Sequence, residues 1–148
     1  MSSTKRVITK TIGQLLLEKG IIRQPQLDEA LKAQKEKGGL LGQILASLGY
    51  VTEEQIAQAI TVQYGFPYLP LSNYEMDDAA VKMVPENVAR QYCLIPIDKI
   101  GNTVTVAMAD PLNTPAVEDI ELVTGCSIQI FVSTTTDIRQ AIDKFYKK

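Results

Sequence analysis

The chain has 148 residues, 45% of them hydrophobic, and a formal net charge of −2, which suits one domain or two small subdomains with a real apolar core. This charge argues against general nucleic-acid binding, and the absence of histidine removes the commonest general base and metal ligand. Cys93 and Cys126 lack metal-ligand spacing, so both are interpreted as small core residues and no metal site is expected.

The N-terminal residues 1–6 lack the apolar segment of a secretory signal, and no apolar run approaches the ~20 residues that cross a bilayer. We therefore expect a cytoplasmic protein without direct membrane insertion. Residues 1–39 carry eight Lys or Arg against four Asp or Glu. This basic segment suits an acidic partner or an anionic ligand, but a solvated helix face is the interpretation we favour.

The first two expected helices form a pair. Residues 12–19 are amphipathic and end at Gly20, which is typical of a helix C-terminus. Pro25 is expected at the first position of a second helix that runs to Gln34. Residues 35–39 then form a polar linker with two glycines.

The same plan is repeated in the next stretch of chain. Residues 11–34 align without a gap with residues 40–63, at an offset of 29 residues. In the second block, Gly49 ends the first helix and residues 52–55 are a capping box that opens the next. Because one helix pair cannot bury its apolar face, the duplication predicts a four-helix tandem unit.

Composition changes after residue 63. Residues 64–70 are aromatic and rich in proline, so we expect an extended connecting segment there. Two short helices are expected at 77–83 and 85–92, with Pro85 at the first position of the second helix. Strands at 94–98 and 103–109 follow, joined as a hairpin through residues 100–102.

The remaining chain adds a helix, a strand and a helix. Thr114 is expected to cap a helix that Pro115 opens and Gly125 ends, followed by a strand at 128–132 and a helix at 136–146. The expected fold is therefore α+β. A four-helix tandem repeat (1–63) and a connecting segment (64–70) precede an α/β subdomain (71–148) of order ααββαβα. Its small mixed three-stranded sheet spans residues 94–132, with a right-handed parallel crossover between the second and third strands.

The sequence holds no phosphate-binding loop, nucleophile elbow or metalloprotease motif. Asp110 ends a strand, but with Asn113 it is better interpreted as a turn and cap residue before the next helix. The acidic pairs, including Glu118-Asp119, are expected in first helical turns, where the helix dipole favours them. We expect no catalytic residues and no enzymatic activity.

The repeat is the one pattern that would suit a ligand. Helix-start amides at residues 12–13 and 41–42 suit an anion, and the glycines allow close approach to the backbone. Gln34 and Gln63 have the donors and acceptors to read a purine edge. Helix packing and local capping explain the same residues without any ligand.

At these two blocks the chain resembles the N-terminal domain of type II secretion and type IV pilus assembly ATPases, the MshE-type N-terminal domain. That family carries a tandem motif R-L-G-x-x-L-L-x-x-G-L-L-x-x-x-x-L-x-x-x-L-x-x-Q with a five-residue spacer. Here the motifs are residues 11–34 and 40–63. The second half is similar to the family at residues 84–90, 94–97, 106–113 and 141–146.

The resemblance implies binding of cyclic di-GMP at the motif positions. The implied ligand contacts, including the residue before the first motif, are Lys10, Thr11, Ile12, Gly13, Gln34, Leu40, Leu41, Gly42 and Gln63. The chain departs from the family at both motif arginines, which are Thr11 and Leu40 here. Lys10 or Arg6 would have to replace them. Because lysine is a point charge without the planar pair of donors that arginine offers, weakened or lost affinity is expected.

The resemblance also implies docking onto a protein of the secretion or pilus machinery, at the inner face of the membrane through that partner. Any ATPase motor would lie outside this chain, which would then be either a fragment or a free-standing domain. We expect a non-catalytic docking or regulatory domain without a cofactor. A cyclic di-GMP sensor is the alternative.

Overall fold

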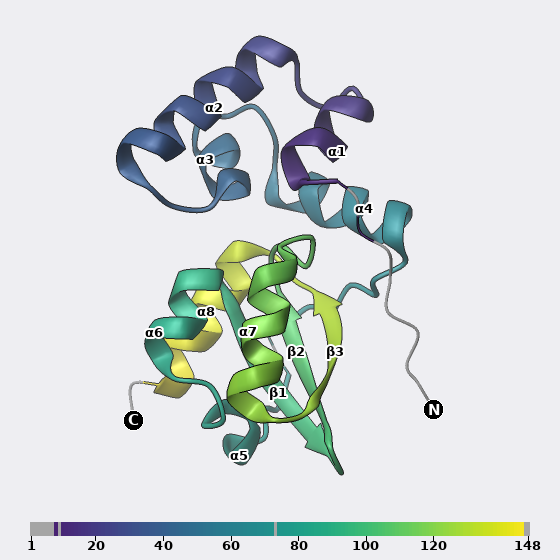
Figure 1. Ribbon diagram of the computed structural model, residues 1–148, viewed down its shortest axis with the longest axis vertical. Helices are drawn as coiled ribbons and strands as arrows, with labels where there is room; N and C mark the ends of the chain where they lie inside the picture. The colour runs from purple at the N-terminus through teal and green to yellow at the C-terminus, as the bar shows by residue number, and fades with distance from the viewer. Residues whose placement is uncertain (1–7, 9, 73, 147–148) are drawn as a thin grey trace.

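The computed structural model describes residues 8, 10–72 and 74–146. Four helices form one half of the molecule, shown at the top of Figure 1. They are α1 (Ile12–Glu18), α2 (Gln24–Lys37), α3 (Leu41–Ser47) and α4 (Glu53–Tyr64). The expected helix pairs are therefore present, and we call this part the helical half.

Local capping explains where two of these helices begin. Thr52 accepts a hydrogen bond from the Gln55 amide at 3.0 Å, and the Gln55 side chain accepts one from the Thr52 amide at 2.8 Å. Thr11 and Gln14 form the same reciprocal pair at the start of α1. These capping boxes satisfy amides that would otherwise lack a partner.

Helix α2 is longer than expected. It continues to Lys37, so the prediction of a linker over residues 35–39 is wrong for its first three residues. Lys35 and Lys37 lie in the last turn, where the helix dipole favours cations. The turn itself is made by Gly38 and Gly39, at φ of 75° and 101°. The helix begins at Gln24, so Pro25 occupies its second position.

The other half of the molecule, which we call the α/β half, contains a three-stranded sheet and four helices (Figure 1). Its elements are α5 (Asp78–Val81), α6 (Glu86–Tyr92), β1 (Leu94–Ile100), β2 (Thr103–Met108), α7 (Thr114–Thr124), β3 (Ser127–Val132) and α8 (Thr135–Tyr146). The sheet has the order β1-β2-β3, with β1 antiparallel and β3 parallel to β2. The expected α+β class and mixed sheet are confirmed.

Several helix starts differ from expectation. Pro85 is the N-cap of α6, and Asn113 caps α7, so Thr114 is the first helical residue there. No acidic residue lies in the first turn of α7, so the prediction for Glu118-Asp119 is wrong. With Asn113 as the cap, α7 begins at Thr114, and Glu118 and Asp119 lie beyond its first turn. The helix dipole stabilises acidic side chains chiefly in that first turn.

The connecting segment is held against the sheet. Tyr64 still belongs to α4, which Gly65 ends at a φ of 76°. The Leu69 amide donates to the Val132 carbonyl at 2.9 Å, and the Val132 amide donates to the Pro67 carbonyl at 2.8 Å. The segment thus runs alongside β3.

Two apolar clusters make up the core. The helical cluster also takes in Leu112 and Val132 from the α/β half. In return Leu40, at the start of α3, packs against the α/β cluster. Cys93 and Cys126 are buried as expected, and burial raises the pKa of the Cys93 thiol to about 11. Within the described ranges, no helix has the length and apolar character needed to span a bilayer.

Candidate functional site

The positions of the two family arginines serve the fold in this chain. Thr11 is the N-cap of α1, and its side chain accepts from the Gln14 amide at 3.2 Å. Leu40 occupies the N-cap position of α3 and is half-buried against the α/β cluster. Neither side chain offers the planar pair of donors with which arginine binds phosphate.

Both motif glycines lie where helices approach closely. A Cβ atom on Gly13 would lie 2.8 Å from Leu27 Cδ1 and 3.0 Å from Leu41 Cδ2. A Cβ atom on Gly42 would lie 3.4 Å from Ile56 Cδ1. Leu27 and Ile56 are equivalent positions of the repeat. Each glycine therefore makes room for the side chain at the same position of its own helix pair. These contacts give the glycines a packing role that needs no ligand.

The two motifs nevertheless meet in space. The glycine of the first motif lies against Leu41 of the second, and Ile12, next to that glycine, is buried in the helical cluster. The Gln34 side chain donates to the Gly39 carbonyl at 3.0 Å, just before the second motif begins. The start of α1, the start of α3 and the end of α2 are thereby brought into one region.

Gln63 is exposed near the end of α4. Lys10 makes an ion pair with Glu18, and this hydrogen bond is the main cause that raises the pKa of Lys10. Tyr64 adds a smaller electrostatic contribution to the same rise in the pKa of Lys10. Lys10 is therefore engaged by a carboxylate, and Arg6 lies outside the described residues.

Two surface cavities lie elsewhere in the described part of the molecule. One of about 250 Å³ is lined by Lys19, Ile21, Gln55, Gln58, Ala59 and Val62. The other, of about 470 Å³, lies between the end of α3 and the starts of α4 and α8 and is lined by Ala46, Gly49, Val51, Thr52, Glu53, Glu54, Thr134, Thr136 and Asp137. Neither of these two cavities is lined by any of the nine predicted ligand residues.

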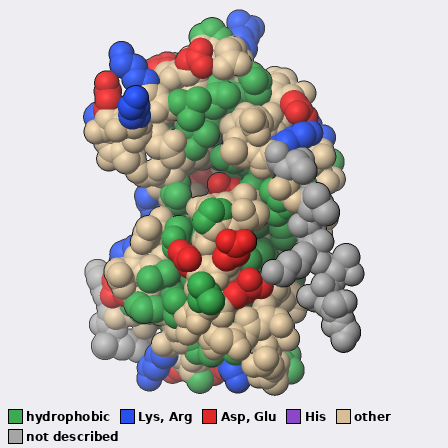
Figure 2. Space-filling model, in the orientation of Figure 1, with side chains coloured by type: hydrophobic (Ala, Val, Ile, Leu, Met, Phe, Trp, Pro, Cys, Tyr) green, Lys and Arg blue, Asp and Glu red, His purple; other side chains and the backbone are tan. Residues whose placement is uncertain are grey.

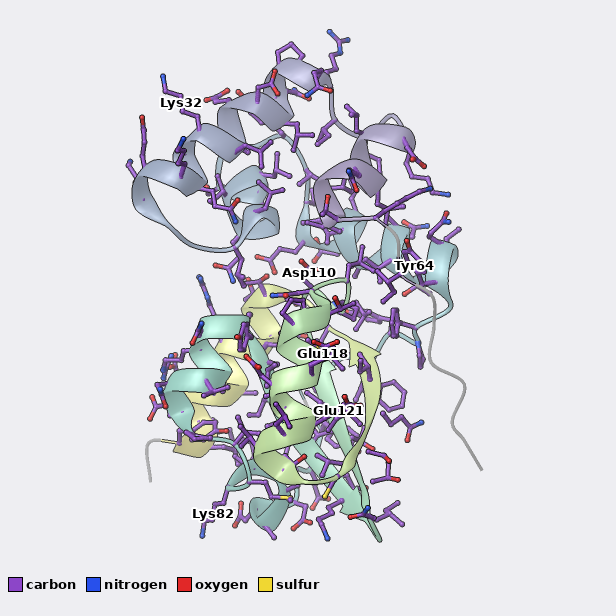
Figure 3. The ribbon with its side chains drawn as sticks, in the orientation of Figure 1. Lys32, Tyr64, Lys82, Asp110, Glu118 and Glu121 are labelled. Carbon is purple, nitrogen blue, oxygen red and sulfur yellow. The ribbon has the colours of Figure 1, made fainter. Side chains whose placement is uncertain are left out.

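Asp110 is a turn residue, as the sequence indicates. One of its carboxylate oxygens accepts from the Leu112 amide at 3.0 Å, and its carbonyl accepts from the Asn113 amide at 3.2 Å. Burial raises the pKa of Asp110 to about 6, and the hydrogen bond from Leu112 opposes that shift. In Figure 3 this residue lies at the end of the α/β half that faces the helical half.

The residues that join the two halves were not found by sequence reasoning. Glu53, at the start of α4, accepts from the Thr136 amide and from the Thr136 hydroxyl, both at 2.9 Å. Arg139 of α8 donates to the side chain of Gln43 in α3. The capping pattern around Glu53 indicates a helix start, but the sequence does not show that its side chain reaches a second helix.

Comparisons with known proteins agree with this fold. A family model described as the MshEN domain matches residues 64–148. The type IV pilus assembly ATPase PilB of Myxococcus xanthus is 32% identical over 135 residues, which cover 91% of this chain and 24% of that protein. A solved structure of MshE with cyclic di-GMP superposes with a TM-score of 0.69 at 32% identity, covering 93% of this chain and all of that one.

The N-terminal domain of XpsE has the same fold, with a TM-score of 0.73 at 22% identity over 97% of this chain and 99% of that chain. This chain spans about a quarter of the length of the PilB relative. The matched part is a non-catalytic domain, and the ATPase motor of the full-length relatives lies in the rest of their chains.

Proposed function

This chain belongs to the MshEN domain family, and from that premise we propose that it is a non-catalytic docking or regulatory domain that acts through contacts with a protein of a secretion or pilus machinery. The similarity to PilB supports an association with a pilus or secretion machinery. The matched part of the relatives is non-catalytic, which supports a role through binding.

The observation that carries this proposal is that the two positions where the family motif has arginine make structural contacts in this chain. Thr11 closes a capping box, and Leu40 packs against the α/β cluster. Two positions that would have to recognise phosphate and guanine instead stabilise the fold. A domain that keeps its architecture without those forks is better suited to binding a protein surface.

The proposal is tested by co-expressing the chain with each cytoplasmic protein of the secretion or pilus machinery encoded in the same genome. We expect one of them to co-purify with the chain in a stoichiometric complex. Failure of every candidate to co-purify, under conditions where a known pair of the same machinery does, would overturn the docking role.

The second candidate is a cyclic di-GMP sensor. It is favoured by the 32% identity to MshE, whose solved structure holds that ligand, and by the meeting of Gly13 with Leu41 across the two motifs. Lys10 would then supply the cation, and Gln34 and Gln63 would read the guanine edges.

Calorimetric titration of cyclic di-GMP separates the two candidates. The docking proposal expects no heat of binding for the natural chain, for Gln34→Ala or for Gln63→Ala. Binding that both glutamine variants abolish would establish the sensor instead. Thr11→Arg restores one motif arginine, so a gain of binding in that variant alone would show that the rest of the pocket is intact.

A further inference from the structure

The smaller surface cavity, of about 250 Å³, lies between the end of α1 and the side of α4, and we call it the α1/α4 cavity. It is lined by Lys19, Ile21, Gln55, Gln58, Ala59 and Val62. Val62 is 68% exposed, so the apolar part of this lining is open to solvent. The volume lies below the range of about 300–1,000 Å³ that small-molecule ligands occupy, so the cavity suits a single side chain.

The tandem repeat contains a second place built from the equivalent residues. Helix α3 begins and ends 29 residues after α1, and α4 begins 29 residues after α2. Helix α1 packs on α4, as α2 packs on α3 (Figure 1). Exchanging the two repeats therefore turns the six lining residues, in the order given above, into Leu48, Tyr50, Gln26, Glu29, Ala30 and Ala33. We call these residues the α2/α3 site.

A tyrosine of the chain itself belongs to the α2/α3 site. Tyr50 is half-buried against the helical cluster, and its hydroxyl donates to the Glu29 carboxylate. That hydrogen bond is the main cause that raises the pKa of Tyr50. The phenol side chain thus reaches from the end of α3 to the side of α2 and joins the two helix pairs.

The α1/α4 cavity lacks this side chain. Ile21 stands at the position equivalent to Tyr50, and it has neither the aromatic ring nor the hydroxyl. Gln58 stands at the position of Glu29, and its exposed side chain has no hydrogen-bond partner among the described residues. A carboxamide oxygen accepts a hydrogen bond from a phenol as a carboxylate does. The cavity therefore lies between Ile21 and the acceptor that a tyrosine at that position would reach.

The charge at the cavity favours an acidic neighbour of such a tyrosine. Lys19 is the one charged residue among the six that line it, and it is exposed and makes no ion pair within the described ranges. In Figure 2 the acidic side chains lie closest together on the α/β half, where α7 lies. An acidic segment is repelled from that face and attracted to Lys19 on the helical half.

We propose that the α1/α4 cavity receives a tyrosine side chain from an acidic segment of the partner protein, with the phenol hydroxyl bound by Gln58 and a neighbouring carboxylate by Lys19. The partner then supplies in trans what Tyr50 supplies within the chain at the α2/α3 site. This contact rests on the docking role proposed above and names the chemistry of its partner.

Nuclear magnetic resonance titration of the ¹⁵N-labelled 148-residue chain tests the proposal with p-cresol, which is the tyrosine side chain alone. The amide signals of Ile21, Gln58 and Val62 should shift and saturate, with a Kd of about 1–10 mM. Toluene, which lacks the hydroxyl, should bind more weakly by a factor of about 3 or more. The peptide acetyl-Asp-Glu-Tyr-Asp-amide should bind about 2–5-fold more tightly than p-cresol at low salt, and about 1 M salt should remove this difference.

Two substitutions exchange the residues of the equivalent positions. Ile21→Tyr supplies the missing side chain from within the chain and should abolish the saturable shifts. Tyr50→Ile opens the α2/α3 site and should create a second binding site for p-cresol, with new shifts at Glu29. Ile100→Tyr adds a tyrosine at an apolar position that is 74% exposed and lies outside the cavity, and it should bind p-cresol like the natural chain.

The charge is tested separately. Lys19→Gln should bind p-cresol unchanged but lose the tighter binding of the acidic peptide. Lys32→Gln removes an exposed lysine of α2 that does not line the cavity and should keep that tighter binding. Circular dichroism spectra that match the natural chain verify that each variant is folded.

Three outcomes would overturn the proposal. The first is the absence of saturable shifts at the lining residues with up to about 20 mM p-cresol. The second is a shift of the same signals with protein concentration alone, because a second copy would then fill the cavity. The third is a machinery protein that co-purifies equally well with the natural chain and with Ile21→Tyr, a result that leaves the docking role standing and removes only this contact.

Discussion

Glu53 of α4 caps α8 from the other half of the molecule, with both of its carboxylate oxygens accepting from Thr136, one from the amide and one from the hydroxyl, at 2.9 Å. Thr134 caps the same helix from within, since its hydroxyl accepts from the Asp137 amide at 3.2 Å. The first turn of α8 is thus satisfied partly by its own chain segment and partly by the tandem repeat. A local rule of helix capping here joins the two halves through residues that are 83 positions apart in sequence.

Glu53→Ala should lower the free energy of unfolding by about 1–3 kcal/mol, because it leaves a helix-start amide and a hydroxyl without their acceptor. Urea denaturation measures the loss. Glu54→Ala, one residue on and exposed, is the matched control and should change stability by no more than about 0.5 kcal/mol. A double-mutant cycle with Thr136→Val should show coupling, and additive losses would contradict the cap.

The two motif glycines should respond differently to alanine. Gly13→Ala should destabilise by about 1–2 kcal/mol, since its Cβ would lie 2.8 and 3.0 Å from two leucine side chains, a cost that exceeds the helix propensity gained. Gly42→Ala has a nearest contact of 3.4 Å and should be neutral or stabilising by up to about 1 kcal/mol. Thermal unfolding of both variants compares them, and equal losses would refute the packing role.

Asp110 should make stability depend on pH. Its pKa is raised from 3.8 to about 6, so between these values the unfolded chain is ionised while the folded one holds the proton. Stability therefore falls as pH rises from about 4 to about 6. Asp110→Asn keeps an acceptor for the Leu112 amide and should be more stable than the natural chain at pH 7.5 by about 1–3 kcal/mol.

At about pH 3 that advantage should vanish, because the natural carboxyl is then largely neutral in both states. Asp78→Asn, in the first turn of α5, is the control and should gain nothing at pH 7.5, since the helix dipole favours the charge it removes. A constant difference between Asp110→Asn and the natural chain across this pH range would show that the carboxyl is not perturbed.

Restoring an arginine should cost less stability in the first motif than in the second. Thr11→Arg removes the hydroxyl of a capping box on an exposed residue, a loss of about 1 kcal/mol. Leu40→Arg replaces a half-buried side chain packed on the α/β cluster and should cost about 1–3 kcal/mol. Urea denaturation of dilute protein measures both, with Leu31→Arg as an exposed control. A neutral Leu40→Arg would mean that this contact contributes little.

The division into residues 1–63, 64–70 and 71–148 stays a prediction, and fragments test it. We expect residues 64–148 to fold more stably than residues 71–148, by about 2–3 kcal/mol. The longer fragment keeps both backbone hydrogen bonds to Val132 and the bond from the Ser133 hydroxyl to the Leu69 carbonyl at 2.9 Å. Equal stability of the two fragments would show that the connecting segment does not stabilise the α/β half.

Much of the fold could be predicted because its signals are local. The capping box at Thr52, the glycine that ends α7 and the alternation of β2 each depend on residues within one turn or one strand. The errors were also local. Asn113 competed with Thr114 for the cap of α7, and the lysines after Gln34 extended α2 because their charges suit its end.

The sequence by itself determined the order of the elements, the α+β class and the tandem repeat, because these follow from periodicity and from groups a few residues apart. Only the tertiary structure decided what the motif positions do. Gly13 admits Leu41 of the second motif, and Leu40 packs against the α/β cluster. Such roles depend on which surfaces meet after folding. The periodicity of apolar residues in the sequence indicates which face of a helix is buried, but not which element packs against that face.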